Sequence, residues 1–293
     1  MSSIQWYPGH MTKSIRMMRE NLAMVDILIE LLDARIPFSS KNPDIDGLAS
    51  SKKRIAVLNK ADLADEHQNR AWKRYYEGLG YLVATTDSAA GKGLQEVAAM
   101  ARQLMAEKIA RQKARGRLVV PTRAMIVGIP NVGKSTMINR YAKKAVTKVA
   151  DRPGVTRGKQ WIKISPDFEL LDTPGILWPK FEGPSGRNLA IIGSINDNIL
   201  DITDLASRLI QLLLQIKPES LKSRYAIDFD SSDQPFAILK KIGRARGFKT
   251  KEGEIDMRRC AIILLDEYRG GKLGRITLET PEAQDSNHNK EEI

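Results

Sequence analysis

The 293-residue sequence contains a single cysteine, Cys260, and only three histidines. One cysteine excludes an internal disulfide framework and a multi-cysteine zinc site, and three scattered histidines argue against a histidine-built metal cluster. No apolar run approaches the roughly 20 residues of a bilayer-spanning helix, and the opening MSSIQWYPGHMT lacks the apolar block of a signal peptide. We therefore expect a cytoplasmic protein without a membrane partner, in which Cys260 is a buried helix residue.

Positive charge is in excess. Lysine and arginine number 47 against 35 acidic residues, which gives a net charge of +12. This balance favours a polyanionic partner, with nucleic acid ahead of a membrane surface. Residues 108–123 carry six basic side chains and no acid, and residues 240–251 repeat that bias. In the second stretch we expect phosphate contacts from Lys240, Lys241, Arg244 and Arg246; a solvated charged face is the alternative.

Short apolar runs alternate with helical patterns along the first two-thirds of the chain. Buried strands are predicted over residues 24–34, 53–62, 81–93, 160–165 and 168–175, and a helix over 94–115. Residues 123–143 predict a strand, a glycine loop and a helix. The alternation predicts an α/β fold, a mostly parallel sheet with helices on both faces. Ligands of such sheets bind at the carboxyl ends of the strands.

The pattern changes beyond about residue 185 and becomes helical. Helices are predicted over residues 203–218, 234–247 and 256–271, the first with Thr203 and Asp204 as cap candidates. We therefore expect a small, mostly helical C-terminal domain. The predicted organisation is an N-terminal helical segment (1–22), the α/β domain (23–184), the helical domain (185–280) and a disordered tail (281–293).

The stretch GIPNVGKS, residues 128–135, fits the phosphate-loop pattern G-x-x-x-x-G-K-[ST]. Glycines allow backbone N–H groups to turn inward around phosphates, and the following helix presents its positive end there. Lys134 is expected to reach the β- and γ-phosphates, and the Ser135 hydroxyl to bind Mg²⁺. The other predicted nucleotide-binding residues of this loop are Gly128, Asn131, Val132, Gly133 and Thr136.

The tetrapeptide DTPG, residues 172–175, follows the predicted strand FELL. Asp172 is expected in the Mg²⁺ shell, and the Gly175 N–H at the γ-phosphate. Thr156, between the two motifs, is placed to give the metal a second hydroxyl. Alone, each of these could be an ordinary turn.

The stretch VLNKAD, residues 57–62, predicts recognition of guanine. The Asp62 carboxylate can accept from the ring N–H and the amino group of guanine. Adenine has an acceptor at that ring nitrogen and would leave the carboxylate unpaired, which discriminates by about 10⁴-fold or more. Lys60 can cover the base and Asn59 can brace the loop. Ser88 and Ala89, after the next strand, would bring a backbone N–H to the guanine oxygen.

The order of these motifs is unusual, because the phosphate loop comes first in an ordinary GTP-binding domain. The termini of a compact domain often lie close together, so a chain can be joined there and cut elsewhere without changing the sheet. We therefore predict a circularly permuted P-loop GTPase domain that binds GTP and GDP. The γ-phosphate-sensing segment DTPGILWPK would then lead directly into the helical domain and couple the nucleotide to its position.

These motifs resemble the circularly permuted bacterial GTPases of the RbgA (YlqF) family. The resemblance runs along nearly the whole chain, through WYPGHM near the start, LDARIPFSSKNP at 32–43 and INDNILDITDLA at 195–206. Lys41 is a mild departure, since arginine is expected there. Other permuted ribosomal GTPases add a β-barrel or a multi-cysteine zinc module, and one cysteine argues against those.

The resemblance implies a GTP hydrolase that binds a late precursor of the large ribosomal subunit, rRNA included; we expect it to be a monomer. Ras-like enzymes place a water-orienting glutamine where this chain has Ile176, so intrinsic hydrolysis should be slow. The resemblance implies His10 as a substitute, and a K⁺ at Asn131; a structural histidine and a loop-bracing amide are the alternatives. The predicted catalytic residues are His10, Asn131, Lys134 and Thr156. A switch that acts on a protein partner without rRNA is the alternative function.

Overall fold

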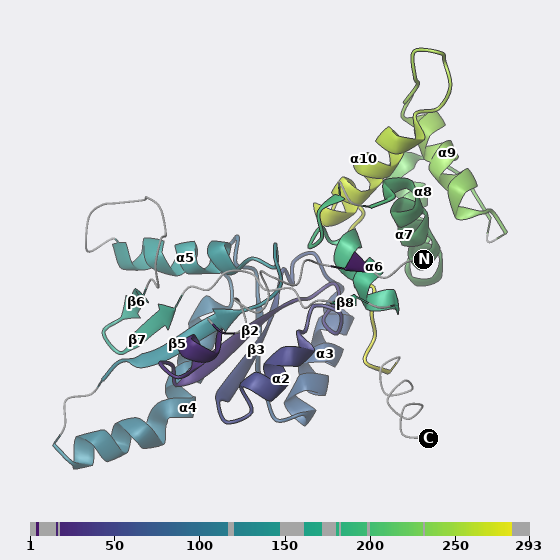
Figure 1. Ribbon diagram of the computed structural model, residues 1–293. Coiled ribbons are helices and arrows are strands. Elements are labelled where there is room, and N and C mark those ends of the chain that lie inside the picture. Colours follow the sequence, from purple (N-terminus) through teal and green to yellow (C-terminus); the bar gives the residue numbers. More distant parts are fainter. Residues whose placement is uncertain are drawn as a thin grey trace.

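The computed structural model describes residues 4–5, 16, 18–116, 120–146, 161–171, 180–181, 183–197, 200–230 and 232–282. These residues form a six-stranded sheet with flanking helices and, beside it, a group of helices from the C-terminal part of the chain (Figure 1). The predicted tether, residues 172–180, and the predicted tail lie almost entirely outside the described residues.

The main sheet has the strand order β4-β3-β2-β5-β7-β6. Its strands are β2 (Ile27–Asp33), β3 (Lys53–Asn59), β4 (Leu82–Thr86), β5 (Thr122–Val127), β6 (Trp161–Ser165) and β7 (Phe168–Leu171). All neighbours are parallel except the β6–β7 pair at one edge. A second, two-stranded antiparallel pair joins β1 (Ile4–Gln5) to β8 (Lys180–Phe181).

The strand order confirms the predicted permutation. The phosphate-loop strand β5 lies in the interior of the sheet, between β2 and β7, although β2, β3 and β4 all precede it in the chain. The register aligns Asp33 with Asn59, and Asn59 with Thr86. The carboxyl ends of these three strands therefore meet at one edge of the sheet, where the sequence places the base-recognition motifs.

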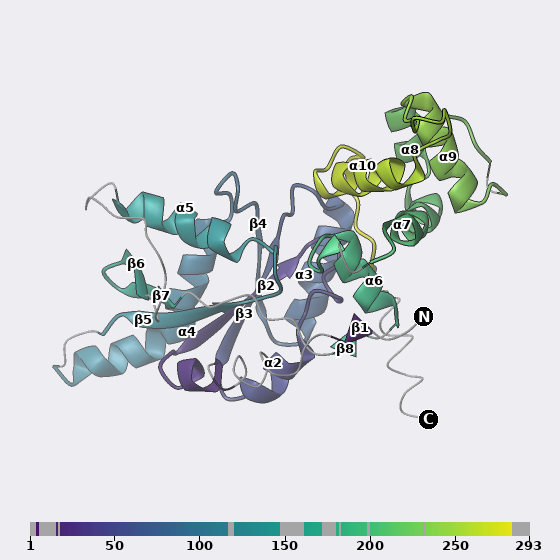
Figure 2. The same cartoon turned by 45° about the horizontal axis from the view of Figure 1, so that its top comes forward.

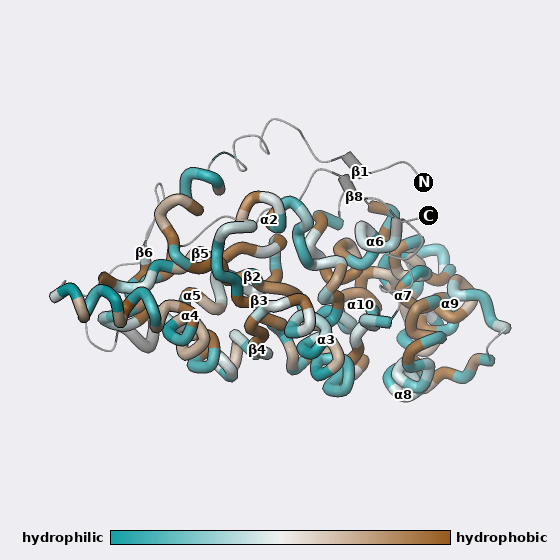
Figure 3. Tube along the Cα trace, turned by 90° about the horizontal axis from the view of Figure 1, so that it is seen from below, coloured by the Kyte–Doolittle hydropathy of each residue, from teal (hydrophilic) through white to brown (hydrophobic). Residues whose placement is uncertain are grey.

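Apolar side chains on both faces explain why the sheet is covered by helices on both sides. All seven residues of β2 are buried. One face packs against α4 (Leu94–Ala114) and α5 (Lys134–Val146), and the other against α2 (Pro43–Leu48) and α3 (Glu66–Gly78). Figure 3 shows the apolar strands between α2 and the α4–α5 pair. The predicted α/β fold is confirmed.

The C-terminal helices form a second body beside the sheet (Figure 2). They are α6 (Gly183–Ile191), α7 (Ile202–Ile216), α8 (Glu219–Tyr225), α9 (Pro235–Ala245) and α10 (Met257–Arg269). In α7 the buried positions Ile202, Leu205, Leu209 and Leu213 form a stripe at helical spacing. The predicted cap of this helix is wrong. Asp201 is the N-cap, and it accepts hydrogen bonds from the backbone N–H groups of Thr203 and Asp204.

Helices α9 and α10 approach closely at Gly243. A Cβ atom there would lie 2.5 Å from Cys260 Sγ and 2.5 Å from Ile255 Cγ2. Cys260 itself is fully buried in α10, as the sequence predicts. Glycine at position 243 is thus required by packing between the helices.

After α10 the chain returns to the sheet domain. Residues 275–279, here called the C-terminal strap, run beside the loops that follow β2 and β3. The backbone N–H of Ile276 donates to Leu63 O at 3.0 Å, and that of Leu278 donates to Arg35 O at 2.8 Å. The expected domain boundary at residue 280 stays a prediction, but the strap contacts the sheet domain.

None of the helices in the described part of the chain combines the length and the apolar character that crossing a bilayer requires.

Candidate nucleotide-binding site

The predicted guanine loop leaves the end of β3 in a tight turn. Lys60 has a φ of +60°, which turns the chain away from the sheet, and Asp62 then lies exposed. The turn is held by a bond from Ala61 N–H to Thr86 O at 3.1 Å and one from Leu63 N–H to Lys60 O at 2.9 Å. The Asp62 carboxylate therefore stands in solvent at the carboxyl edge of the sheet, where a ligand can reach it.

The phosphate loop connects β5 to α5 through residues with positive φ. Asn131 has a φ of +60° and Gly133 of +108°, so successive N–H groups can face a common centre. Lys134 is buried, and its Nζ donates to Gly128 O at 2.8 Å and Ile129 O at 2.9 Å. Ser135 and Thr136 are exposed in the first turn of α5. A buried ammonium, inward N–H groups and a helix N-terminus fit a nucleotide phosphate chain.

Asn59 ties the guanine loop to both neighbouring loops. Its Oδ1 accepts from Thr86 Oγ1 at 2.9 Å, and from the Ser88 N–H at 3.1 Å and Oγ at 2.7 Å. Its Nδ2 donates to Val132 O, in the phosphate loop, at 2.7 Å. Since this amide is almost fully buried, it fixes the predicted guanine and phosphate sites relative to each other.

The described residues hold only part of the predicted metal and catalytic set. His10, Thr156, Asp172, Gly175 and Ile176 lie outside the described ranges. Ser135 is the one predicted Mg²⁺ ligand that is described. Within the described part of the chain, no three His, Cys, Asp or Glu side chains gather as a metal site. Ala89 lies exposed beside buried Ser88, at the edge that carries Asp62.

Comparisons with known proteins agree with this geometry. A family model described as "50S ribosome-binding GTPase" matches residues 123–239. The chain is 46% identical to "Ribosome biogenesis GTPase A" of Bacillus cereus over 280 residues, which cover 95% of this chain and 94% of the relative. It is 30% identical to the protein of the same name from Thermotoga maritima, over 95% of each chain.

The chain belongs to the ribosome biogenesis GTPase A family. This family is also called RbgA or YlqF. The structure described as "Crystal structure of GNP-bound YlqF from T. maritima" is 26% identical, with a TM-score of 0.66, over 92% of this chain and 99% of that chain. A GDP-bound YlqF structure is 27% identical with the same TM-score, over 91% of this chain and 100% of that chain. As a member of the RbgA family, the chain is a GTP hydrolase that binds GTP and GDP.

Two charged residues of the site were not predicted. Asp33 ends β2 and is fully buried, and its carboxylate binds Arg35 through Nε at 2.9 Å and Nη2 at 2.8 Å. The Nζ of Lys60 lies 3.0 Å from Asp33 Oδ2, and it also donates to Asn131 O at 2.6 Å. Asp33 therefore positions the lysine that is expected to cover the base. The sequence signal is Asp-Ala-Arg at the end of a buried strand.

The charge of Asp33 is stabilised by its partners. Burial alone would raise its pKa, but the charges and hydrogen bonds of Arg35 and Lys60 outweigh burial, so the pKa lies well below the ordinary range. Arg35 also donates from Nη1 to Arg269 O at 3.1 Å, and its guanidinium lies over the Tyr268 ring. This buried pair thus links the guanine loop to the end of α10.

We expect Asp33→Asn to lower the free energy of unfolding by about 3–5 kcal/mol, because it leaves the buried Arg35 charge uncompensated. Denaturant unfolding measures the loss. Asp46→Asn is the matched control, since Asp46 is half exposed and pairs with Lys41 and Arg54 at the surface; it should cost about 1 kcal/mol or less. Equal losses in the two variants would contradict a structural role for the buried pair.

The phosphate loop also contacts the segment that enters the helical domain. Asn131 Nδ2 donates to Gly193 O at 2.7 Å, and Ser194 Oγ donates to Pro130 O at 2.9 Å. Arg269 of α10 binds the same segment, with bonds to Ala190 O and Ile191 O. The Asn131 side chain therefore makes a loop-bracing contact. Its predicted role with K⁺ stays a prediction.

The C-terminal strap carries a buried carboxylate, Glu279. It accepts hydrogen bonds from Phe38 N–H at 2.8 Å, from Asn188 Nδ2 at 2.9 Å and from the Ser39 hydroxyl. The strap, α6 and the loop after β2 therefore meet at one side chain. Burial raises the pKa of Glu279, although the bonds from Ser39 and Asn188 act in the opposite direction.

This raised pKa predicts a pH dependence of stability. A carboxyl whose folded-state pKa is raised contributes stability that is fully present below the unfolded-state pKa and is lost as pH rises through the folded-state pKa. The free energy of unfolding of the wild type should therefore fall more steeply with rising pH, over this window, than that of Glu279→Gln. Urea unfolding at a series of pH values measures both. The pKa of Glu30 is also raised by burial, but Glu30 titrates in both proteins and cancels. Parallel profiles would contradict the prediction.

The four predicted RNA-binding residues, three in α9 and Arg246 directly after it, differ in their surroundings. Lys240 and Arg244 are exposed and make no ion pair with any residue that the structure describes. Lys241 pairs with Asp233 at 2.7 Å, and Arg246 lies 3.6 Å from Glu267 and over the Tyr225 ring. Two of the four cations are thus engaged within the helical domain.

Proposed function

We propose that this GTPase binds a late precursor of the large ribosomal subunit, and that GTP hydrolysis couples maturation of the particle to release of the protein. It acts as a monomer in the cytoplasm, with Mg²⁺ bound beside the nucleotide. The names of the relatives support a ribosomal partner, since they include "Mitochondrial ribosome-associated GTPase 1" of Xenopus tropicalis, 29% identical over 94% of each chain.

The observation that carries the proposal for RNA is a ridge on α9. Phe236, Lys240 and Arg244 are exposed and spaced four residues apart, so they lie on one face of the helix. Cations can bind backbone phosphates, and an exposed aromatic ring can stack on an unpaired base. A face that served only to carry solvated charges would not be expected to expose an aromatic ring. The exposed fraction of Phe236 is 53%.

A second observation supports coupling between nucleotide and RNA. Asn131 and Pro130 of the phosphate loop bind the segment at Gly193 and Ser194, and that segment is bound in turn by Arg269 of α10. An RNA that displaces the helical domain would therefore act on the phosphate loop through a short chain of hydrogen bonds. The nucleotide would act on RNA affinity by the same coupling, because linkage is reciprocal.

Within the site, Lys134 and the loop N–H groups would bind the β- and γ-phosphates, and Asp62 the guanine. The hydroxyls of Ser135 and Thr156 and the Asp172 carboxylate would hold Mg²⁺, which supplies positive charge to the phosphates when bound. Ile176 cannot orient water, so we propose that His10 and a K⁺ near Asn131 assist hydrolysis. The precursor particle would complete this arrangement.

We expect hydrolysis by the isolated protein to be slow and to rise steeply on addition of large-subunit precursors. Phosphate release measures the rate, and sedimentation of cell extract measures GTP-dependent co-migration with the particles. The variant Lys240→Gln/Arg244→Gln should lose co-migration and stimulation and keep the basal rate.

The matched comparison is Lys241→Gln/Arg246→Gln, which removes the same charge from two cations that already lie beside Asp233 and Glu267. It should have the smaller effect on co-migration. If the isolated protein already turns over at the stimulated rate, or never co-migrates with precursors, the proposal is wrong. Co-migration with a protein partner alone would favour the regulatory switch.

A further inference from the structure

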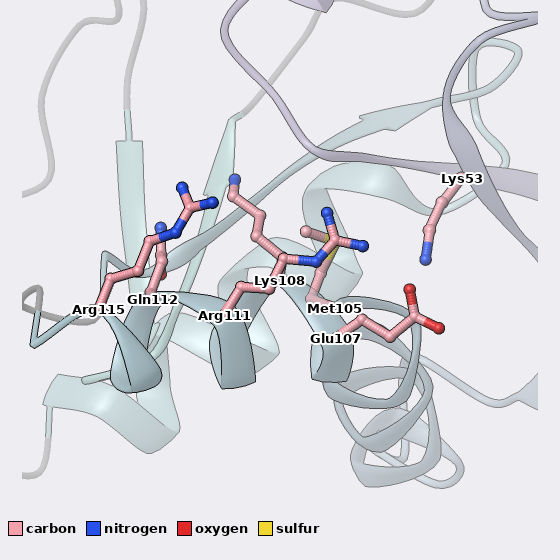
Figure 4. Close-up of a pocket in the computed structure, with 7 residues that line it drawn as sticks. All are labelled: Lys53, Met105, Glu107, Lys108, Arg111, Gln112 and Arg115. Atoms are coloured by element: carbon pink, nitrogen blue, oxygen red, sulfur yellow. The ribbon is translucent and has the colours of Figure 1, made fainter.

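A second basic surface lies on the sheet domain, at the C-terminal half of α4. A cavity of about 340 Å³ is lined there by Lys53, Met105, Glu107, Lys108, Arg111, Gln112 and Arg115. Figure 4 shows Lys108, Arg111 and Arg115 on one side of the helix and Lys53 opposite them, at the start of β3. Four cations thus face one cavity, with Glu107 as the only acid of its lining.

Ion pairs inside the protein account for only part of this charge. Lys108 pairs with Asp26, and Lys53 Nζ donates to the uncharged Leu104 O at 2.6 Å. Arg111 and Arg115 are exposed, and neither forms an ion pair or hydrogen bond through its side chain with any residue that the structure describes. They stand four residues apart, so their side chains are neighbours on the helix surface. Guanidinium groups one helical turn apart are suited to phosphate oxygens, because each can donate in a fork.

The surface does not have the character of a membrane anchor. A basic helix that lies on a bilayer carries large apolar side chains next to its cations. No residue of α4 is among the exposed large hydrophobic residues of the described chain. This composition favours a hydrophilic polyanion over a lipid surface.

We propose that the cavity on α4 is an RNA-binding site, in which Arg111 and Arg115 bind backbone phosphates. The site rests on the proposed function and extends it. The C-terminal half of α4 and the ridge on α9 lie at opposite ends of the molecule in both views (Figures 1 and 2). The two surfaces would therefore contact separate segments of RNA, on either side of the nucleotide site.

The test compares the full-length protein with Arg111→Gln/Arg115→Gln. Glutamine keeps the helix propensity of arginine, so the variant should retain its basal GTPase rate and thermal midpoint. Affinity for purified large-subunit rRNA is measured over a series of salt concentrations. Each lost phosphate contact lowers the slope of log affinity against log salt by about 1, so the double variant should lose about 2.

The matched control is Arg74→Gln/Lys113→Gln. It removes the same net charge from exposed helix positions that do not line the cavity. A slope unchanged from the wild type is expected for the control. Equal slopes for the two double variants would overturn the α4 site and leave the proposed function standing.

Two further outcomes would contradict the proposal, and they differ in what the protein binds. If only binding to vesicles of phosphatidylcholine and phosphatidylserine falls in Arg111→Gln/Arg115→Gln, the surface is a membrane contact and the proposal is wrong. If the wild type binds neither rRNA nor precursor particles, the proposed function fails together with this site.

Discussion

Replacing Asp62 with asparagine is expected to abolish the preference of the protein for GTP and to create a preference for XTP. The carboxylate can accept from both the ring N–H and the amino group of guanine. An amide in its place would present a donor to the guanine amino group, and this mismatched polar contact costs affinity. Xanthine has a carbonyl in place of that amino group, so the asparagine can donate to it.

The expected change in the ratio of the two affinities is about 10⁴-fold, since the site then rejects GTP by leaving a polar group unpaired. Competition of GTP and XTP for a fluorescent GDP analogue measures both affinities. Asp44→Asn is the control, because Asp44 is exposed in the first turn of α2 and follows a different loop. It should keep the wild-type preference. Unchanged selectivity in Asp62→Asn would refute the guanine-binding role of the loop.

Gly133→Ala is expected to weaken GTP binding by about a hundredfold. A Cβ at this position would lie 2.3 Å from Asn59 Nδ2, and the residue has a φ of +108°. Asn59 cannot yield easily, because hydrogen bonds to Thr86, Ser88 and Val132 hold its amide. Displacing it leaves two or more buried polar groups unpaired, at a cost of about 3 kcal/mol, or about two factors of ten in affinity.

Gly80→Ala is the control that distinguishes the collision with Asn59 from backbone strain. Gly80 also has a positive φ, +85°, but nothing lies within 4 Å of the position of its Cβ. That variant should lose stability and keep GTP affinity. Calorimetric titration with a non-hydrolysable GTP analogue compares the two proteins. If Gly133→Ala binds as tightly as Gly80→Ala, the contact with Asn59 is unimportant.

A double variant tests the mechanism of the loss. In Asn59→Ala/Gly133→Ala the colliding amide is absent, so the second substitution should add little to the effect of Asn59→Ala alone. Additive losses would show that Gly133 acts independently of Asn59.

The sequence predicts the regular elements of this fold well, for a physical reason. Strands β2 and β3 are mostly apolar, and α7, α9 and α10 carry stripes of buried residues at helical spacing. Both patterns can be read from the sequence because the apolar residues are the ones that become buried. The cap of α7 was predicted wrongly because Asp201, Thr203 and Asp204 are all good capping residues, and the backbone conformation decides among them.

The charged network of the site could not be predicted in the same way. Glu279 meets Ser39 across 240 residues of chain, and Arg35 reaches Arg269 O across 234. Nothing in the local sequence around LGRITLET identifies it as a strap. The position of Asn59 in the motif led us to expect that it braces its own loop. That it also holds the phosphate loop follows only from the permuted sheet, which brings β3 and β5 to either side of β2.

The return of the chain through residues 275–279 changes the mechanics of the C-terminal helices. They leave the sheet domain through α6 and come back to it at the loops after β2 and β3, and Asn188 of α6 donates to Glu279 of the strap where these two connections meet. Arg35 adds a hydrogen bond to Arg269 O at the end of α10. A displacement of the helices set off by a change of nucleotide must therefore break bonds at this junction, beside the loop that carries Asp62.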